Sequence, residues 1–244
     1  KTSSSMLVPV VLKNRKSFID GLYHETLLFG VFYGVIAIMF LYNAFLFVSI
    51  RDRSYLYYSV YVLSYFVYQF SMDGFVFQYF WPNAVWWANK CIPFLTGVAC
   101  ILTIGFSKSF LAAGTFLPRL SVWLSALQGV FLSFIMASLF MPYRHSIRGA
   151  GILMMVTACS LLAAGVLTFL RGGRSARFYI VAWTGMLLSS VVFGLTRFGA
   201  LPNLFITQNA QHLGALFEVV LLSFALGDRI NIMEKEKEDA QRQA

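Results

Sequence analysis

Residues 206–244 read ITQNAQHLGALFEVVLLSFALGDRINIMEKEKEDAQRQA. The first part, Ile206 to Leu226, has about the length of the ~20 apolar residues that cross a bilayer as a helix. Neither glycine nor proline follows Gly227, and the remaining residues are mostly charged or polar. Because Gly and Pro are the residues that most often end a helix, this stretch predicts one helix that crosses a membrane and continues into water.

The whole chain has the composition of an integral membrane protein. Of its 244 residues 59% are hydrophobic and only 12% are charged, with a mean hydropathy of +0.71, which is too apolar for a soluble domain. Seven stretches can span a bilayer: Leu27 to Ile50, Tyr55 to Met72, Ala88 to Phe106, Ser121 to Phe140, Gly149 to Leu170, Phe178 to Phe198 and Ile206 to Leu226. The alternating ~10-residue segments of a membrane barrel are absent. We predict an all-α membrane protein, a seven-transmembrane-helix bundle.

Seven crossings place the two chain ends on opposite sides of the membrane. The connections on the C-terminal side carry seven basic residues: Arg51, Arg53, Lys108, Arg119, Arg171, Arg174 and Arg177. Those on the other side carry four: Lys90, Arg144, Arg148 and Arg197. The positive-inside rule therefore predicts a cytoplasmic C-terminus and an outer N-terminus. Contacts with anionic lipid explain the net charge of +9, and we expect no nucleic-acid partner.

Aromatic and histidine side chains gather near the ends of the predicted spans. We interpret Tyr55, Tyr57 and Tyr58, which follow the first span, as interfacial anchors. The three histidines are expected on the outer side, where solvated roles are favoured and a pH- or metal-sensing role is the alternative. They are His24, His145 and His212.

The sequence carries no enzyme signature. There is no His-Glu-x-x-His, no Gly-rich phosphate loop and no Gly-x-Ser-x-Gly. Cys91, Cys100 and Cys159 lack the spacing of metal ligands. The seventh span has no lysine for a retinal Schiff base, and the motifs of eukaryotic G-protein-coupled receptors are absent. We predict no catalytic residue, no metal site and no cofactor.

Glu218 is the acidic residue placed midway along a predicted span. A charge at the bilayer centre costs about 2.5–3.5 kcal/mol on insertion scales, so the side chain should face the bundle interior and either find a partner or be protonated. The candidate partners are Arg197, near the end of the sixth span, and Asn43 and Tyr42 in the first. Two hypotheses stay open, a contact with a ligand, ion or switch, and a hydrogen-bonded clamp between helices.

The tail beyond the seventh span carries a heptad-like pattern. Its candidate a and d positions are spaced 4, 3, 4, 3, 4, with mostly charged or polar residues between them, and Lys237 is the charged member of the set: Leu226, Ile230, Met233, Lys237, Ala240 and Ala244. This pattern favours a short parallel dimeric coiled coil over a simple solvated helix. A homodimer through the C-terminal helix is therefore expected.

Several stretches at both ends of the chain form a specific combination. They are FYG (32–34), YNAFLF (42–47), RDRSYLYY (51–58), GFVFQYFWP (74–82), GALP (199–202), EVVLLSFAL (218–226) and DRIN (228–231). This combination resembles the bacterial seven-transmembrane receptors with diverse intracellular signalling modules. The resemblance implies a jelly-roll, carbohydrate-binding-like sensor domain before the first span, with Met6 to Leu12 as its last strand. After the seventh span it implies a histidine kinase of a two-component system, a diguanylate cyclase or phosphodiesterase, or a phosphatase.

We therefore expect the membrane module of a longer bacterial inner-membrane sensor, not itself an enzyme. Residues 1–26 would end a periplasmic sensor domain or stalk, residues 27–227 would form the membrane domain, and residues 228–244 would begin a cytoplasmic signalling helix. The expected partners are membrane lipids, a second copy of the chain, and an unknown small-molecule or carbohydrate-like ligand bound by the outer domain. The alternative function is a membrane carrier or ion pathway that uses Glu218 and Arg197.

Overall fold

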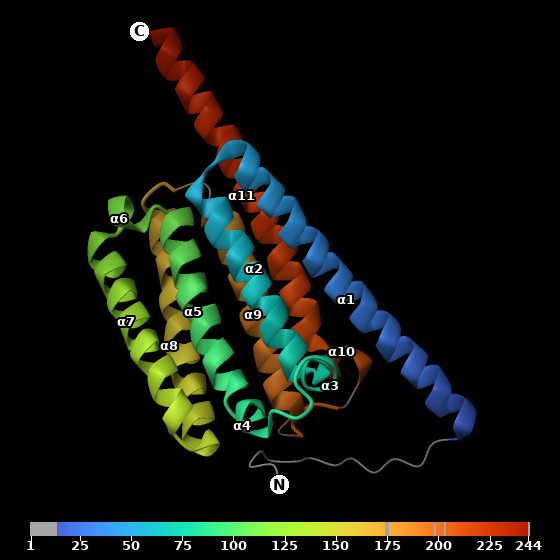
Figure 1. The fold of residues 1–244 in the computed structure, drawn as a ribbon. Helices are drawn as coiled ribbons and strands as arrows, with labels where there is room; N and C mark the ends of the chain where they lie inside the picture. Colours follow the sequence, from blue (N-terminus) through green and yellow to red (C-terminus); the bar gives the residue numbers. More distant parts are fainter. Residues whose placement is uncertain (1–13, 174–175, 198, 203, 244) are drawn as a thin grey trace.

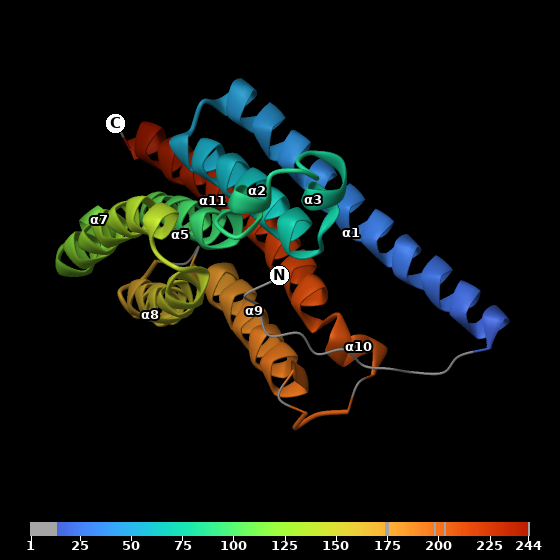
Figure 2. The same ribbon diagram turned by 60° about the horizontal axis from the view of Figure 1, so that its bottom comes forward.

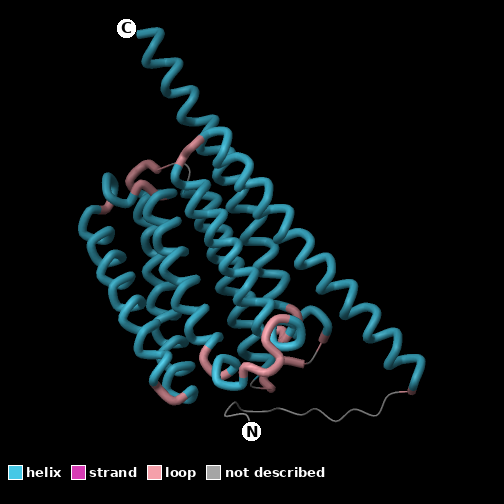
Figure 3. Tube along the Cα trace, in the orientation of Figure 1, coloured by secondary structure: helices cyan, strands magenta, loops and turns pink. Residues whose placement is uncertain are grey.

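The computed structural model describes the backbone of residues 14–173, 176–197, 199–202 and 204–243. Side chains are described within the same ranges as far as Asp228, except that of Arg197. The strand predicted at Met6 to Leu12 lies outside the described residues. Figure 3 shows helices and loops, and no strand, in the part of the chain that is described.

Seven long helices run roughly along one direction (Figure 1). They are α1 (Arg15–Ile50), α2 (Arg53–Met72), α5 (Cys91–Phe110), α7 (Pro118–Phe140), α8 (Tyr143–Leu170), α9 (Ala176–Arg197) and α11 (Ala210–Gln243). Four short helices lie in the connections: α3 (Phe75–Tyr79), α4 (Val85–Ala88), α6 (Ala113–Phe116) and α10 (Phe205–Gln208). Each long helix corresponds to one predicted span, so the predicted seven-helix bundle is confirmed.

Six of the long helices are apolar enough to cross a membrane by composition, and α2 is the described long helix that is not. Tyrosine, serine and glutamine side chains lower its hydropathy. Yet α2 has 20 residues and packs along both α1 and α5. Many of its polar side chains are buried against protein instead of facing lipid, which is where a membrane helix tolerates them.

Helices α1, α2, α5, α8, α9 and α11 pack neighbour to neighbour in a ring, and α7 packs outside the ring against α5 and α8 (Figures 1 and 2). The core lies inside this ring and contains large aromatic residues. Tyr55, Tyr58, Phe106, Phe110 and Tyr179 are each at most 1% exposed. The prediction that Tyr55 and Tyr58 anchor the bundle at the membrane interface is therefore wrong. Of these three predicted anchors, Tyr57 is the one that points outward, at 40% exposed.

Helices α9 and α11 pack so closely that two of their glycines have no room for a side chain. A Cβ atom on Gly214 of α11 would lie 2.3 Å from the Ser189 side chain of α9. A Cβ atom on Gly185 of α9 would lie 2.6 Å from the Phe217 ring of α11. Small residues allow two membrane helices to approach in this way, so α11 has little freedom to move relative to α9 without repacking.

The two ends of the chain extend beyond the bundle in different ways. Helix α1 begins at Arg15, ahead of the predicted span start at Leu27, and its first turns diverge from the other helices (Figures 1 and 2). Helix α11 continues unbroken through Gly227 to Gln243 and leaves the opposite end of the bundle. The predicted continuity of the last helix is confirmed. We call the end from which α11 projects the tail end, and the other the N-terminal end.

Candidate functional site

Helix α11 is held to its neighbours by polar contacts spaced along its length. In chain order they involve His212, Glu218, Val219, Ser223 and Asp228. Their partners lie on three other helices or at their ends, α2, α1 and α9. We call these five positions the α11 polar line, and it is the candidate functional site.

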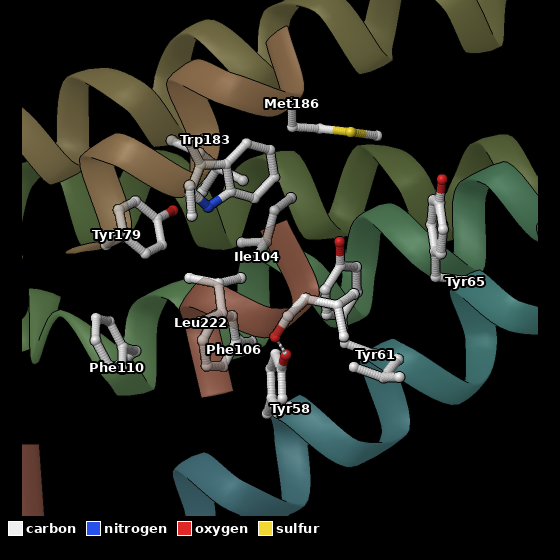
Figure 4. Packing of buried hydrophobic residues seen from close by; sticks show 14 of the residues in the cluster. Tyr58, Tyr61, Tyr65, Ile104, Phe106, Phe110, Tyr179, Trp183, Met186 and Leu222 are labelled. Atoms are coloured by element: carbon white, nitrogen blue, oxygen red, sulfur yellow. Dashed lines mark hydrogen bonds between the residues drawn. The ribbon is translucent and has the colours of Figure 1, made fainter. Parts of the chain in front are cut away.

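Glu218 lies at the centre of the α11 polar line and is 1% exposed. Its Oε1 atom accepts a hydrogen bond of 2.9 Å from the Tyr61 hydroxyl. One turn before Tyr61 on α2, the Tyr58 hydroxyl donates to the backbone carbonyl of Val219, the residue after Glu218. Tyr58, Tyr61 and Tyr65 are spaced three and four apart on α2, so they share one helix face, and Figure 4 shows all three pointing from α2 into the core.

The other predicted site residues fall at different places. Asn43 of α1 is fully buried, and its Nδ2 atom donates to Ser223 Oγ at 3.0 Å and to the Met39 carbonyl at 2.8 Å. Tyr42 is 52% exposed on the outer surface of α1. Arg197 ends α9, and its side chain lies outside the described part. Asn43 therefore does contact α11, but the described donor to Glu218 is Tyr61.

A second polar cluster surrounds His212 at the N-terminal end. His212 Nε2 lies 3.0 Å from Asp73 Oδ2 and 3.2 Å from Gln69 Nε2. Gln69 also donates to Asp73 at 3.2 Å, and the Tyr33 hydroxyl of α1 donates to the same carboxylate. His212 is 8% exposed, so the expected solvated role of this histidine is wrong. The cluster joins α1, the end of α2 and α11 at one point.

Aromatic rings shield the His212 cluster. Phe29 and Phe32 of α1 pack edge-on to the imidazole with ring-centroid distances of 5.4 and 4.7 Å. Tyr65 extends the cluster toward Glu218, because its hydroxyl lies 3.5 Å from Gln69 Oε1. The face of α2 that carries Tyr58, Tyr61, Tyr65 and Gln69 therefore bonds to α11 at both Glu218 and His212.

The sequence contains a pattern that indicates these residues. Tyr58, Tyr61, Tyr65, Gln69 and Asp73 follow a spacing of three, four, four and four, which places them on one helix face. A polar stripe of this kind on a membrane helix indicates a buried contact with another helix.

A cavity of about 80 Å³ lies beside Glu218, inside the ring of helices. Tyr61, Tyr65, Trp183 and Met186 face a common space in Figure 4. The residues that line the cavity come from α2, α5, α8, α9 and α11, and most of its surface is apolar. Glu218 is the acidic group among these residues. The centre of the α11 polar line therefore borders an internal space.

At the tail end a charged pair marks the point where α11 leaves the bundle. Arg177 Nη2 of α9 lies 3.2 Å from Asp228 Oδ2 of α11, with side chains 56% and 29% exposed. The Arg177 guanidinium also lies 4.6 Å from the centre of the Phe178 ring. An exposed pair of this kind contributes at most about 1 kcal/mol, so it can break and re-form easily.

The α11 polar line joins α11 to neighbouring helices. Its hydrogen bonds connect side chains of one helix to side chains or carbonyls of another. Within the described residues, no group of three His, Cys, Asp or Glu side chains is arranged to hold a metal ion.

The fold and the polar line define a multi-pass helical membrane protein in which the last helix connects the interior of the bundle to the space beyond it. The chain belongs to the family described as 7TM diverse intracellular signalling, whose model matches residues 25–229. Membership in this family gives the chain a role in transmembrane signalling. No curated protein and no solved structure matches the chain.

Proposed function

We propose that the chain is the receptor domain of a bacterial inner-membrane sensor and that α11 is the element that carries the signal. The single observation that supports this most directly is the continuity of α11. One helix contains the buried contacts of Glu218 and His212 and also extends beyond the bundle to Gln243. Any rotation or shift at its buried half reaches the projecting half without a joint to absorb it.

The direction of signalling follows from the distribution of charge. In the connections between the spans, seven Lys and Arg residues at the tail end, against four at the other end, favour a cytoplasmic tail. The signal then passes from the periplasm or the membrane toward the cytoplasm. The output domain after residue 244 is a histidine kinase, an enzyme that makes or degrades cyclic di-GMP, or a phosphatase, as the resemblance implies.

The switch is a shift of population between two packings of the bundle. In one packing α11 keeps the contacts described above. In the other, α11 turns or slides against α2. The heptad-like pattern of the tail, which begins at Leu226 and Ile230, then pairs differently with the tail of a second copy. Small coupling energies suffice, since a shift of about 1.4 kcal/mol changes an equilibrium tenfold.

The carrier hypothesis has less support. A carrier needs a polar path through the bundle, but the core on the tail side of Glu218 contains large apolar and aromatic side chains. Tyr58, Phe106 and Leu222 are fully buried there. Figure 4 shows Tyr58, Phe106 and Leu222 packed in the core.

Insertions after Asn231 in the full-length protein test the proposal. Four inserted residues disturb the heptad phase of the tail, whereas seven inserted residues preserve it. We expect the four-residue insertion to change the activity of the output domain severalfold and the seven-residue insertion to leave it close to normal. Equal activity for both insertions and the parent protein would rule out transmission through the phase of this helix.

A further inference from the structure

The cavity beside Glu218 adjoins a larger crevice and shares two lining residues with it. At the N-terminal end, α1 and the start of α11 enclose a crevice of about 1290 Å³. Tyr68 and Gln211 line both the crevice and the cavity. Along α11, Gln211 lies about two turns closer to the N-terminal end than Glu218. The cavity thus lies next to the crevice, with Glu218 further along α11 from the N-terminal end.

The carboxyl groups that line the two spaces favour positive charge. Glu218 lines the cavity, and Glu25 and Asp73 line the crevice together with His24 and His212. No lysine or arginine is among the described residues that line either space, although the chain has 19 of them. A region lined by carboxyl groups with apolar walls attracts positive ions.

The cavity combines the carboxyl group of Glu218 with aromatic rings. In the described structure Glu218 receives one hydrogen bond, from Tyr61 to Oε1, whereas a carboxylate can accept about four. The rings of Tyr61, Tyr65, Tyr68 and Trp183 form much of the surrounding wall. A carboxylate within a wall of Tyr and Trp rings is the chemistry that binds organic ammonium ions, through charge-assisted hydrogen bonds and cation–π contacts.

The size of the cavity limits the ligand. A cavity of about 150 Å³ holds one benzene molecule, which has six heavy atoms, so the space of about 80 Å³ beside Glu218 holds about three. We propose that this cavity binds a small primary alkylammonium of about two carbons, with its charged end at Glu218 and its alkyl chain against Met186 and Ala158. The inference concerns binding alone and does not rest on the proposed signalling function.

The test uses the full chain in nanodiscs of zwitterionic lipid and radiolabelled ethylammonium as the probe. We expect binding that excess unlabelled ethylammonium displaces. Ethanol, which has the same number of heavy atoms and no charge, should compete at least about tenfold more weakly, the difference expected when a charge-assisted bond is lost. Equal competition by ethanol, or no displaceable binding up to about 10 mM, would overturn the proposal.

Two variants locate the binding site. Glu218→Gln keeps the shape of the side chain and should weaken the binding of ethylammonium about tenfold or more while leaving that of ethanol unchanged. Ala158→Phe fills the cavity and should abolish the binding of both. Cys159→Phe is the matched control, because the adjacent Cys159 is exposed on the outside of α8, and it should bind like the parent protein. Unchanged affinity in both Glu218→Gln and Ala158→Phe would place the ligand elsewhere and refute the assignment.

Discussion

The hydroxyl of Tyr61 on α2 donates a hydrogen bond to the buried carboxyl of Glu218 on α11, 157 residues further along the chain. Tyr58 donates to the carbonyl of the adjacent Val219. Two consecutive positions of α11 are therefore bonded to one face of α2. These bonds fix both the rotation and the height of the output helix relative to α2.

Removing the Tyr61 hydroxyl should destabilise the fold measurably. Tyr61→Phe leaves the Glu218 carboxyl buried without its donor, which costs about 1–3 kcal/mol. The measurement is the free energy of unfolding in mixed micelles. Tyr57→Phe is the control, because Tyr57 is 40% exposed, and its effect should stay within about 0.5 kcal/mol. Equal stability of both variants would mean that the Tyr61 bond contributes nothing.

The Asp73 cluster should behave as one coupled unit. Asp73→Ala removes the acceptor of Tyr33, Gln69 and His212 together and should lower the free energy of unfolding by about 2–3 kcal/mol. A double-mutant cycle with His212→Ala should give a coupling energy of about 0.6–1.7 kcal/mol, the range for polar contacts between membrane helices.

The control for the Asp73 cluster is His145→Ala, since His145 is an exposed histidine at the same end of the bundle. It should show no coupling to Asp73→Ala. Strict additivity of Asp73→Ala and His212→Ala would contradict the direct contact between these two side chains.

The close approach of α9 and α11 should make Gly214 intolerant of any side chain. Gly214→Ala brings a Cβ atom to 2.3 Å from the Ser189 side chain, and overpacking of this kind costs about 1–3 kcal/mol. Ser189→Gly removes the side chain that is met, so the double variant should recover most of the loss. Gly227→Ala on the same helix has no atom within 4 Å of the new Cβ and should be neutral or stabilising. A Gly214→Ala variant as stable as Gly227→Ala would show that the two helices can separate freely.

The order of helices was predictable from the sequence because length and hydropathy decide which segments can cross a bilayer. The start of α1 at Arg15, ahead of the apolar stretch, was not predictable in this way. Polar residues such as Asp20, His24 and Glu25 precede the apolar stretch, and hydropathy alone cannot tell a helix that extends beyond the membrane from a loop.

The site was only partly predictable for a similar reason. Glu218 stood out, since an acid amid apolar residues must be buried. Its donor Tyr61 and the buried His212 did not, because hydropathy does not show whether a polar side chain is buried against protein or lies at the membrane interface. Only the packing of α2 against α11 distinguishes the two environments, and that packing depends on contacts between residues far apart in the sequence.

The Arg177 and Asp228 pair should matter more for signalling than for stability. Both side chains are partly exposed, so Asp228→Asn should change the free energy of unfolding by less than about 1 kcal/mol. Because Asp228 lies where α11 leaves the bundle, we expect the same variant to change the activity of the output domain. Exchanging the charges with Arg177→Asp and Asp228→Arg should restore that activity. Failure of the exchange to restore it would assign the effect to Asp228 alone.

The most direct measurement is whether a covalent bridge across the α11 polar line blocks transmission. In the full-length protein with Cys91, Cys100 and Cys159 replaced by serine, Asn43→Cys and Ser223→Cys place a thiol pair where the native side chains lie 3.0 Å apart. Adding Tyr61→Phe should change the activity of the output domain when the pair is reduced. It should have no effect when the pair is oxidised, because α11 is then held in one packing. An activity that changes equally in both states, or in neither, would contradict transmission by movement of α11.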